Sequence, residues 1–217
     1  MCQKPTGVSA ARLTRAARLL HPVVRFLRPV LYPIICQQEF AFCRDVLSDV
    51  TGGKLLLHLG EETLPLMLDD RSRVVSIPQD TDGQTTSRAK DELRAFAQAE
   101  RLPDKLRENF VTASWEAVTN AAKYGKDGSL RICASATRIQ VWITDQGPGI
   151  SLADIPHATL QDGYSTGGTA GVGYTFMIRF ADHLDLLTGP GGTTIVLTWS
   201  RDGAEDPRIR QLLERYA

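Results

Sequence analysis

The hexapeptide Asp145-Gln146-Gly147-Pro148-Gly149-Ile150 follows residues 138–144, which are predicted to form a strand because isoleucine and valine alternate with more polar neighbours. Two glycines around a proline predict a tight turn at the strand end, and they let a flat ligand approach the backbone. Asp145 ends a buried strand and needs a hydrogen-bond donor, because an unpaired buried carboxylate is costly. The exocyclic amine of a purine would supply that donor, whereas the hexapeptide considered alone also fits a purely structural turn.

A long helix is predicted before this strand, from Pro103 to about Tyr124, and Gly125 ends it. Its apolar positions are predicted to face the core: Val111, Trp115, Val118 and Ala122. The opposite side carries a second set: Asn109, Glu116, Asn120 and Lys123. A carboxylate, amides and an ammonium group therefore share one face, as expected for either a solvated surface or a binding site.

A glycine-rich loop is predicted over residues 163–173, directly before a helix over residues 172–182. Backbone N–H groups in such a loop and at a helix N-terminus can bind phosphate. The loop is not a Walker motif, because no Gly-Lys-Ser/Thr sequence ends it, and its spacing does not fit the dinucleotide-binding pattern. A flexible lid is the alternative. Thr193 opens the last predicted strand and could hydrogen-bond a base.

The remaining predicted elements are helices first and strands later. The helices lie at residues 9–28, 37–50, 87–100 and 206–216, and the strands at 54–59, 73–78, 130–136, 184–187 and 193–199. Because helices and strands do not alternate in βαβ units, the sequence predicts an α+β layered sandwich.

Charge is distributed unevenly along the chain. The 25 basic and 25 acidic residues give no formal net charge, yet residues 1–38 contain six basic residues and no acidic one. The remaining residues therefore carry a net charge of −6, which predicts a basic extension on an acidic domain. An acidic domain argues against a main surface for nucleic acid. The basic amphipathic residues 9–28 suit a docked helix, a loosely ordered arm or attachment to a membrane surface.

Other features indicate the compartment. No stretch approaches the roughly 18 apolar residues that suggest a transmembrane helix. Four cysteines at positions 2, 36, 43 and 133 form no CxxC pair, which favours free thiols over a metal site or disulfide framework. We therefore expect a cytoplasmic protein without a transmembrane segment.

The order of the motifs is more informative than any single motif. A Glu-x3-Asn pair on a helix, Asp-x-Gly-x-Gly after a strand, a glycine-rich loop before a helix and Gly-Thr on the last strand together resemble the ATP-binding domain of the GHKL superfamily. The resemblance covers residues 72–200 and looks closest to anti-sigma-factor serine/threonine kinases, including the switch-protein kinase of the bacterial stressosome. It implies a Bergerat-type fold, a two-layer sandwich of helices on a mixed, mostly antiparallel sheet, with a lid at residues 157–170 over an ATP pocket.

The resemblance divides the chain into four parts: a basic arm (1–34), a small extension of helix and strand (35–71), the ATP-binding domain (72–200) and a C-terminal helix (201–217). It also implies individual roles. Glu116 corresponds to the general base and Asn120 to the Mg²⁺ ligand, which suits the preference of Mg²⁺ for few, hard oxygen ligands. The other implied ATP contacts are Asp145 for the adenine amine, Gly147 and Gly149 for the turn under the base, Gly168, Gly171 and Gly173 for the lid, and Thr193 for the base.

Some residues stand apart from the family pattern. Lys123 is a candidate phosphate contact from its position on the helix face alone. The helix after the lid starts Gly173-Tyr174-Thr175-Phe176, where the family commonly has a small or aliphatic run, and Thr169 and Ala170 replace an expected glycine and leucine. These departures concern the closing geometry of the lid more than the binding of nucleotide.

The resemblance implies a protein kinase that uses ATP and Mg²⁺ to phosphorylate a small regulatory protein, a STAS-domain antagonist, in stress or sigma-factor signalling. A second interpretation is a nucleotide-dependent anti-sigma protein that binds a sigma factor with little catalysis. A sensor histidine kinase fragment is a weaker alternative, because no histidine precedes Glu116 in a helical hairpin. Members of the family often dimerise, so the resemblance leaves open whether this chain forms a homodimer.

Overall fold

The structure, a computed structural model, describes residues 37–68, 71–77, 84–161 and 172–201. The chain divides into two compact units, residues 1–42 and 43–217, and the fold described below is that of the second. A helix over residues 37–50 confirms one prediction. The basic arm and the helices predicted at 9–28 and 206–216 lie outside the described residues.

A six-stranded sheet forms one layer of the fold, with the strand order β1-β5-β6-β4-β3-β2. The strands are β1 (Leu55–His58), β2 (Arg71–Ile77), β3 (Gly128–Ala134), β4 (Arg138–Asp145), β5 (His183–Gly189) and β6 (Gly192–Ser200). Strands β1 and β5 pair in parallel, and every other neighbouring pair is antiparallel. The expectation of a mixed, mostly antiparallel sheet is confirmed.

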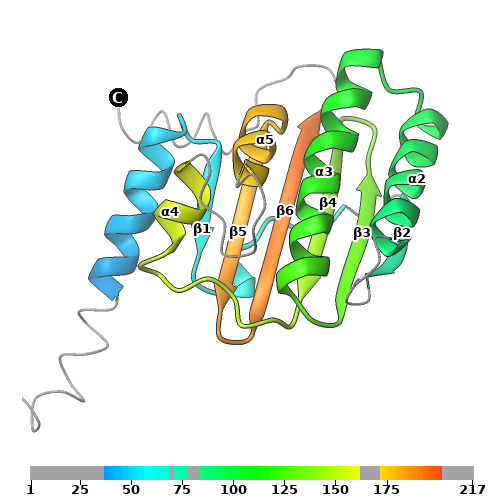
Figure 1. The fold of residues 1–217 in the computed structure, drawn as a ribbon. Helices are drawn as coiled ribbons and strands as arrows, with labels where there is room; N and C mark the ends of the chain where they lie inside the picture. The colour runs from blue at the N-terminus through cyan, green and yellow to red at the C-terminus, as the bar shows by residue number, and fades with distance from the viewer. Residues whose placement is uncertain (1–36, 69–70, 78–83, 162–171, 202–217) are drawn as a thin grey trace, which may run out of the picture. The chain divides into compact units, whose positions relative to one another are not determined.

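Helices form the second layer. The helices α2 (Gln84–Ala99), α3 (Asp104–Tyr124) and α5 (Gly173–Phe180) cover one face of the sheet (Figure 1). A short helix that was not predicted, α4 (Ile155–Leu160), packs on α5. The α+β sandwich is thus confirmed. Within the described part of the chain, no helix has both the length and the apolar character needed to cross a membrane.

Aromatic side chains join the two layers. The ring of Phe110 on α3 lies 6.0 Å from the ring of Phe96 on α2 and 5.1 Å from that of Trp199 on β6, measured between centroids. Trp199 also donates a hydrogen bond of 2.8 Å from Nε1 to the carbonyl oxygen of Phe180, at the end of α5. These contacts hold three helices in place on the sheet, and α3 and α5 are the two that carry the site described below.

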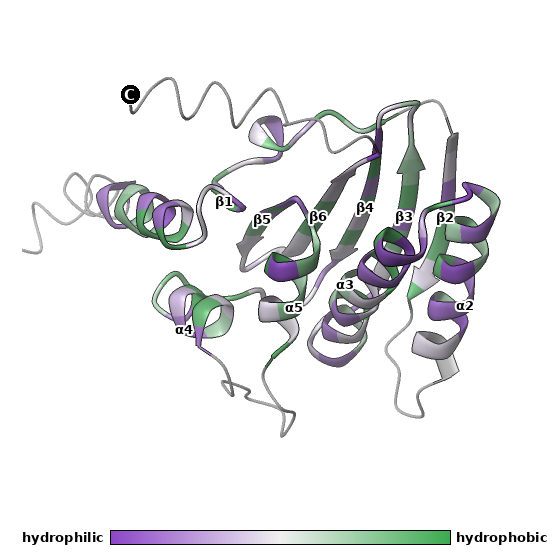
Figure 2. Cartoon of the chain, turned by 90° about the horizontal axis from the view of Figure 1, so that it is seen from above, coloured by the Kyte–Doolittle hydropathy of each residue, from purple (hydrophilic) through white to green (hydrophobic). Residues whose placement is uncertain are grey.

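The chain between β1 and β2 crosses the face of the sheet opposite to the helices (Figure 2). It contains the 3-10 helix η1 (Glu61–Thr63), and the N–H of Leu68 donates to Oε1 of Gln140 on β4 at 3.1 Å. Buried polar side chains lie on this face of the central strands: Gln140, His183, Asp185 and Thr198. The crossing segment thus covers part of a sheet face that a two-layer sandwich would leave open.

Strand β1 lies before the domain boundary predicted at residue 72, yet it pairs within the same sheet as the later strands. Strand β1 pairs with β5 from Leu55 to His58, and Nζ of Lys54 donates to the carbonyl oxygens of Ile178 and Ala181 at 3.2 and 3.1 Å. An ammonium group at the C-terminal end of α5 satisfies carbonyls that have no partner within the helix. The segment therefore belongs to the sheet, a pairing that no local sequence pattern could show.

Candidate nucleotide-binding site

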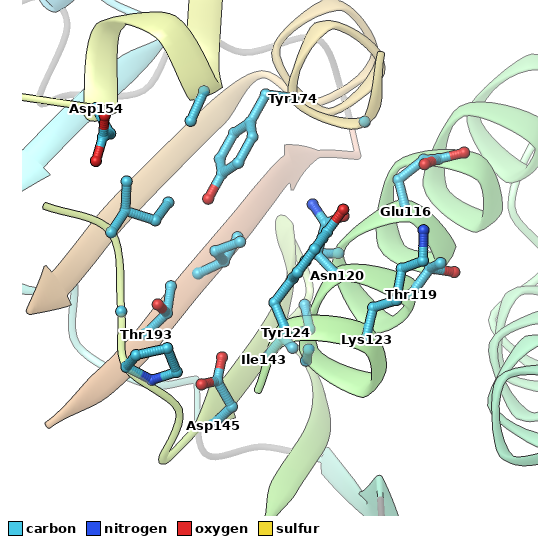
Figure 3. A pocket seen from close by; sticks show the side chains of 18 of the residues that line it. Glu116, Thr119, Asn120, Lys123, Tyr124, Ile143, Asp145, Asp154, Tyr174 and Thr193 are labelled. Atoms are coloured by element: carbon cyan, nitrogen blue, oxygen red, sulfur yellow. The ribbon is translucent and has the colours of Figure 1, made fainter. Parts of the chain in front are cut away.

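A cavity of about 520 Å³ lies where α3 and α5 meet the ends of β4 and β6. Figure 3 shows its lining side chains, with Glu116 and Asn120 on α3 and Asp145 at the end of β4. Seven of the residues predicted for the site line this cavity: Glu116, Asn120, Lys123, Asp145, Gly149, Gly173 and Thr193. Gly147 lies next to it, whereas Gly168 and Gly171 lie outside the described residues.

The turn after β4 holds the carboxylate of Asp145 at the cavity wall. Its Oδ1 accepts a hydrogen bond of 2.7 Å from the N–H of Gly147, and the N–H of Gln146 donates to the carbonyl oxygen of Lys126 at 2.7 Å. Burial raises the pKa of Asp145, and backbone N–H groups of Gly147 and Thr193 partly oppose this rise because they stabilise the charged form. The turn thus presents a half-buried hydrogen-bond acceptor to the cavity.

The far end of this turn is fastened to the β5–β6 hairpin. The N–H of Ile150 donates to Oγ1 of Thr188 at 2.8 Å, and this hydroxyl lies 2.9 Å from Oγ1 of Thr193. Gly149 has a φ of +67°, and a methyl group there would lie 2.0 Å from the carbonyl oxygen of Gly189. The close neighbour of this glycine is thus the protein backbone of the hairpin, whereas the approach of a flat ligand stays a prediction.

We expect Gly149→Ala to displace the turn and to weaken ATP binding, because alanine disfavours positive φ by about 1–2 kcal/mol and its methyl group would overlap the hairpin. Gly191→Ala is the matched control, since nothing lies within 4 Å of a methyl group at that position. Thermal unfolding measures the stability of both variants, and titration with ATP measures their affinity for the nucleotide. Equal behaviour of the two variants would contradict the role of Gly149.

The beginning of α5 lies against the polar face of α3. A methyl group at Gly173 would lie 3.3 Å from Oε2 of Glu116 and 3.4 Å from Nδ2 of Asn120. Burial raises the pKa of Glu116, and the positive charge of Lys90 opposes that rise. The structure therefore brings the first residue of α5 to a carboxylate and an amide that lie one turn apart on α3.

Lys123 lies at the cavity edge in a more open position. The residue is exposed, and its Nζ lies 5.6 Å from the centroid of the Tyr124 ring. Both residues line the cavity. This location permits the phosphate contact that the helix face suggested.

Sequence reasoning missed several residues of the cavity wall. Tyr174 is buried there, and its burial together with the negative charge of Asp145 raises the pKa of its hydroxyl, which stays protonated. Asp154 and Ser151 also line the cavity, joined by a hydrogen bond of 2.6 Å from the serine hydroxyl. A proline in the first turn of α4 was the available signal for this helix start.

One residue was placed on the wrong side of α3. Trp115 was predicted to face the core, but it is half-buried and lines the cavity. The core face of α3 instead comprises Phe110, Val111, Ala113, Ser114, Ala117, Val118, Ala121 and Ala122. At about 100° per residue, Trp115 falls at the border of this face, next to the half-buried Glu116 and Thr119, which also line the cavity.

Comparisons with solved structures give distant matches. The RsbU and RsbW domains of Rv1364c from Mycobacterium tuberculosis share 16% identity, with 58% of this chain and 32% of that chain covered and a TM-score of 0.42. A mycobacterial sensor histidine kinase, MprB, shares 17% identity, with 60% of this chain and 97% of that chain covered and a TM-score of 0.37. No curated protein matches.

The family comparison is more direct. Residues 78–199 match the histidine kinase-like ATPase domain, and this range contains every residue that was predicted for the site. It begins after β1 and β2, so the first two strands of the sheet lie outside the match. Since the match spans more than half of the 217 residues, the chain belongs to the histidine kinase-like ATPase domain family.

Proposed function

We propose that the chain is an ATP-dependent serine/threonine protein kinase whose substrate is a small regulatory protein of the STAS type. The observation that carries this proposal is one cavity in which Glu116 and Asn120 face the first residue of α5, with Asp145 at the far side. Asp145 suits the amine of adenine, because its carboxylate is fixed by backbone N–H groups and only accepts hydrogen bonds. In such an arrangement, one end of the cavity would recognise the adenine base and the opposite end would carry out phosphoryl transfer.

Glu116 has the properties of a general base. Its carboxylate lies beside Gly173, at the α5 end of the cavity, and burial favours uptake of a proton. The acceptor hydroxyl would give its proton to Glu116 while its oxygen bonds to the γ-phosphorus. The bond from that phosphorus to the β,γ-bridging oxygen breaks, and ADP leaves with the electron pair.

Asn120 suits a Mg²⁺ ion bound together with ATP. Its amide lies one helical turn after Glu116 and next to Gly173, where a side chain would fill the space. Magnesium prefers hard oxygen ligands and usually keeps several waters, so one amide oxygen and phosphate oxygens suffice. When bound, the ion would neutralise charge on the phosphates. Lys123 would add a positive charge at the open edge of the cavity.

The test of the proposed nucleotide site is Asp145→Asn. We expect ATP affinity to fall about 10- to 100-fold, because a hydrogen bond to a charged group contributes roughly 1.5–3 kcal/mol. Asparagine keeps an oxygen for the N–H of Gly147, so the turn is retained while the second acceptor is lost. Calorimetry with ATP and Mg²⁺ measures the effect.

Asp127→Asn is the control, because it removes a carboxylate that is mostly exposed, with 64% of its side chain accessible. Unchanged ATP affinity in Asp145→Asn would reject the assignment of the adenine end. A kinase assay with STAS-domain partners then tests the acceptor. Tight, nucleotide-dependent binding of a sigma factor without transfer would favour the anti-sigma alternative, and acid-labile phosphohistidine would favour the histidine kinase alternative.

A further inference from the structure

A tyrosine at the start of α5 places its hydroxyl inside the cavity. Tyr174 is the second residue of this helix, lines the cavity and is 9% exposed. Its ring extends from α5 into the cavity, and the hydroxyl points away from Glu116 (Figure 3). The residue before it, Gly173, lies against Glu116 and Asn120, the groups proposed for phosphoryl transfer. The side chain of Tyr174 therefore reaches into the part of the cavity beyond these groups.

The hydroxyl of Tyr174 makes no hydrogen bond with any residue in the described ranges. Buried polar groups in proteins nearly always have a partner, because leaving one unsatisfied costs free energy. Burial and the negative charge of Asp145 raise the pKa of this hydroxyl, which therefore keeps its proton and can donate a hydrogen bond. A ligand that brings an acceptor atom into the cavity would satisfy it.

Other polar side chains on this side of the cavity either accept hydrogen bonds or already donate them. Asp145 carries a carboxylate, which only accepts. The hydroxyl of Thr193 lies 2.9 Å from that of Thr188, and the hydroxyl of Ser151 donates to a neighbouring carboxylate. Adenine and ribose both carry acceptors, the ring nitrogens and the hydroxyl oxygens. Among these residues, Tyr174 is the one with an uncommitted donor.

The surroundings of this hydroxyl favour a neutral acceptor over a phosphate. The cavity wall includes Ile143, Ile150 and Ile195. Apolar walls with a few placed polar groups are typical of sites that bind small organic molecules. The negative charge of Asp145 acts on the hydroxyl of Tyr174, and the same charge would repel a phosphate bound there. The nucleoside part of ATP therefore suits this position better than its phosphates.

We propose that Tyr174 is a nucleoside-binding residue, whose hydroxyl donates a hydrogen bond to a ring nitrogen of the base or to a hydroxyl of the ribose. This inference rests on the proposed nucleotide site and adds a donor to the acceptor that Asp145 supplies. Tyr174 contributes to the affinity for nucleotide, and the chemical step at Glu116 does not depend on it.

The first test is Tyr174→Phe in the full chain. Phenylalanine keeps the buried ring and removes only the hydroxyl, so the affinity for ATP should fall about three- to tenfold, the range of one neutral hydrogen bond. Stability without nucleotide should not fall, because the hydroxyl has no partner to lose among the described residues. Calorimetry with ATP measures the affinity, and thermal unfolding without nucleotide measures the stability.

Thr51→Val is the matched control, because it removes a hydroxyl that has partners and does not line the cavity. Oγ1 of Thr51 donates to the carbonyl oxygen of Leu47 at 2.7 Å and accepts from the N–H of Leu55 at 3.0 Å. This variant should therefore show the opposite behaviour, with lower stability and unchanged affinity for ATP.

The second test locates the acceptor on the nucleotide. ATP, ADP and adenosine share the nucleoside, so Tyr174→Phe should weaken the binding of all three by the same factor. The 2′-deoxy and 3′-deoxy analogues of ATP each lack one ribose hydroxyl, and the 1-deaza, 3-deaza and 7-deaza analogues each lack one ring nitrogen. The analogue that binds equally to wild type and Tyr174→Phe identifies the acceptor, because its hydrogen bond is already absent.

Four results would overturn the inference: unchanged affinity for ATP in Tyr174→Phe, a loss restricted to ATP, a full loss with every analogue, or lower stability without nucleotide. The second would place the hydroxyl at the phosphates, and the last would give it a structural role. Absence of ATP binding by the wild-type chain is a different failure, because it rejects the proposed nucleotide site together with this inference. Wild-type affinity in Tyr174→Phe rejects the inference alone.

Discussion

Glu116→Gln should lower the rate of phosphoryl transfer by about 10²- to 10⁴-fold, the usual contribution of a general base. Glutamine has nearly the same shape, so contacts of the side chain with Gly173 and Asn120 are preserved while the capacity to accept a proton is lost. The affinity for ATP should therefore stay close to that of wild type. Rapid-quench or steady-state measurement of transfer, beside calorimetry with ATP, separates the two quantities.

The pH dependence of turnover provides a second test of Glu116 as the general base. Burial raises the pKa of its carboxyl group, so the group becomes protonated at a higher pH than an ordinary glutamate. A protonated carboxyl cannot accept a proton, and turnover should fall as pH decreases through this raised pKa. Glu108→Gln, which removes an exposed carboxylate of the same helix, is the control. Wild-type transfer in Glu116→Gln would contradict the role of this residue.

His58→Ala should destabilise the fold by about 3–5 kcal/mol, the typical cost of breaking a buried pair. Nε2 of His58 lies 2.8 Å from Oδ1 of Asp185, and these side chains are 11% and 0% exposed. The histidine also joins η1 to the sheet, because its Nδ1 lies 3.1 Å from Oγ1 of Thr63. Alanine would leave a fully buried carboxylate without this partner. Urea unfolding measures the change in the free energy of unfolding.

The control for this prediction is His157→Ala. His157 is exposed on α4, where its Nδ1 lies 3.0 Å from Oε1 of Gln161, so its loss should change stability little. A destabilisation below about 1 kcal/mol in His58→Ala would show that the His58–Asp185 pair contributes no more than an exposed one. The comparison also tests whether β1 is a structural part of the ATPase fold, since His58 is its last residue.

The sequence predicted most of the helices and strands, because their signals are local. Residues 103–124 show a helical repeat with a glycine at the end, and the observed helix is Asp104–Tyr124. The strands around the predicted hairpin at 184–199 are longer by one to two residues at each end but are otherwise as expected. The six-residue helix α4 was missed, because so short a helix has no repeat to detect.

Other features depend on contacts between distant residues. Strand β1 joins the sheet through Leu55 and Leu184, which are far apart in the chain and pair in parallel. Parallel pairing needs a long connection and leaves no turn signal in the sequence. The boundary predicted at residue 72 was placed without knowledge of this pairing, because no local signal in the sequence shows it.

The sequence by itself determined the chemical groups of the site: a carboxylate and an amide one helical turn apart, an aspartate at a strand end and glycines where backbone comes close. These follow from spacing, because a helix or strand places fixed intervals on one face. Only the tertiary structure decided which groups lie beside them. Trp115 turned toward the cavity, Lys90 came to its ring from another helix and Tyr174 entered the wall, because helix packing, and not sequence interval, sets these distances.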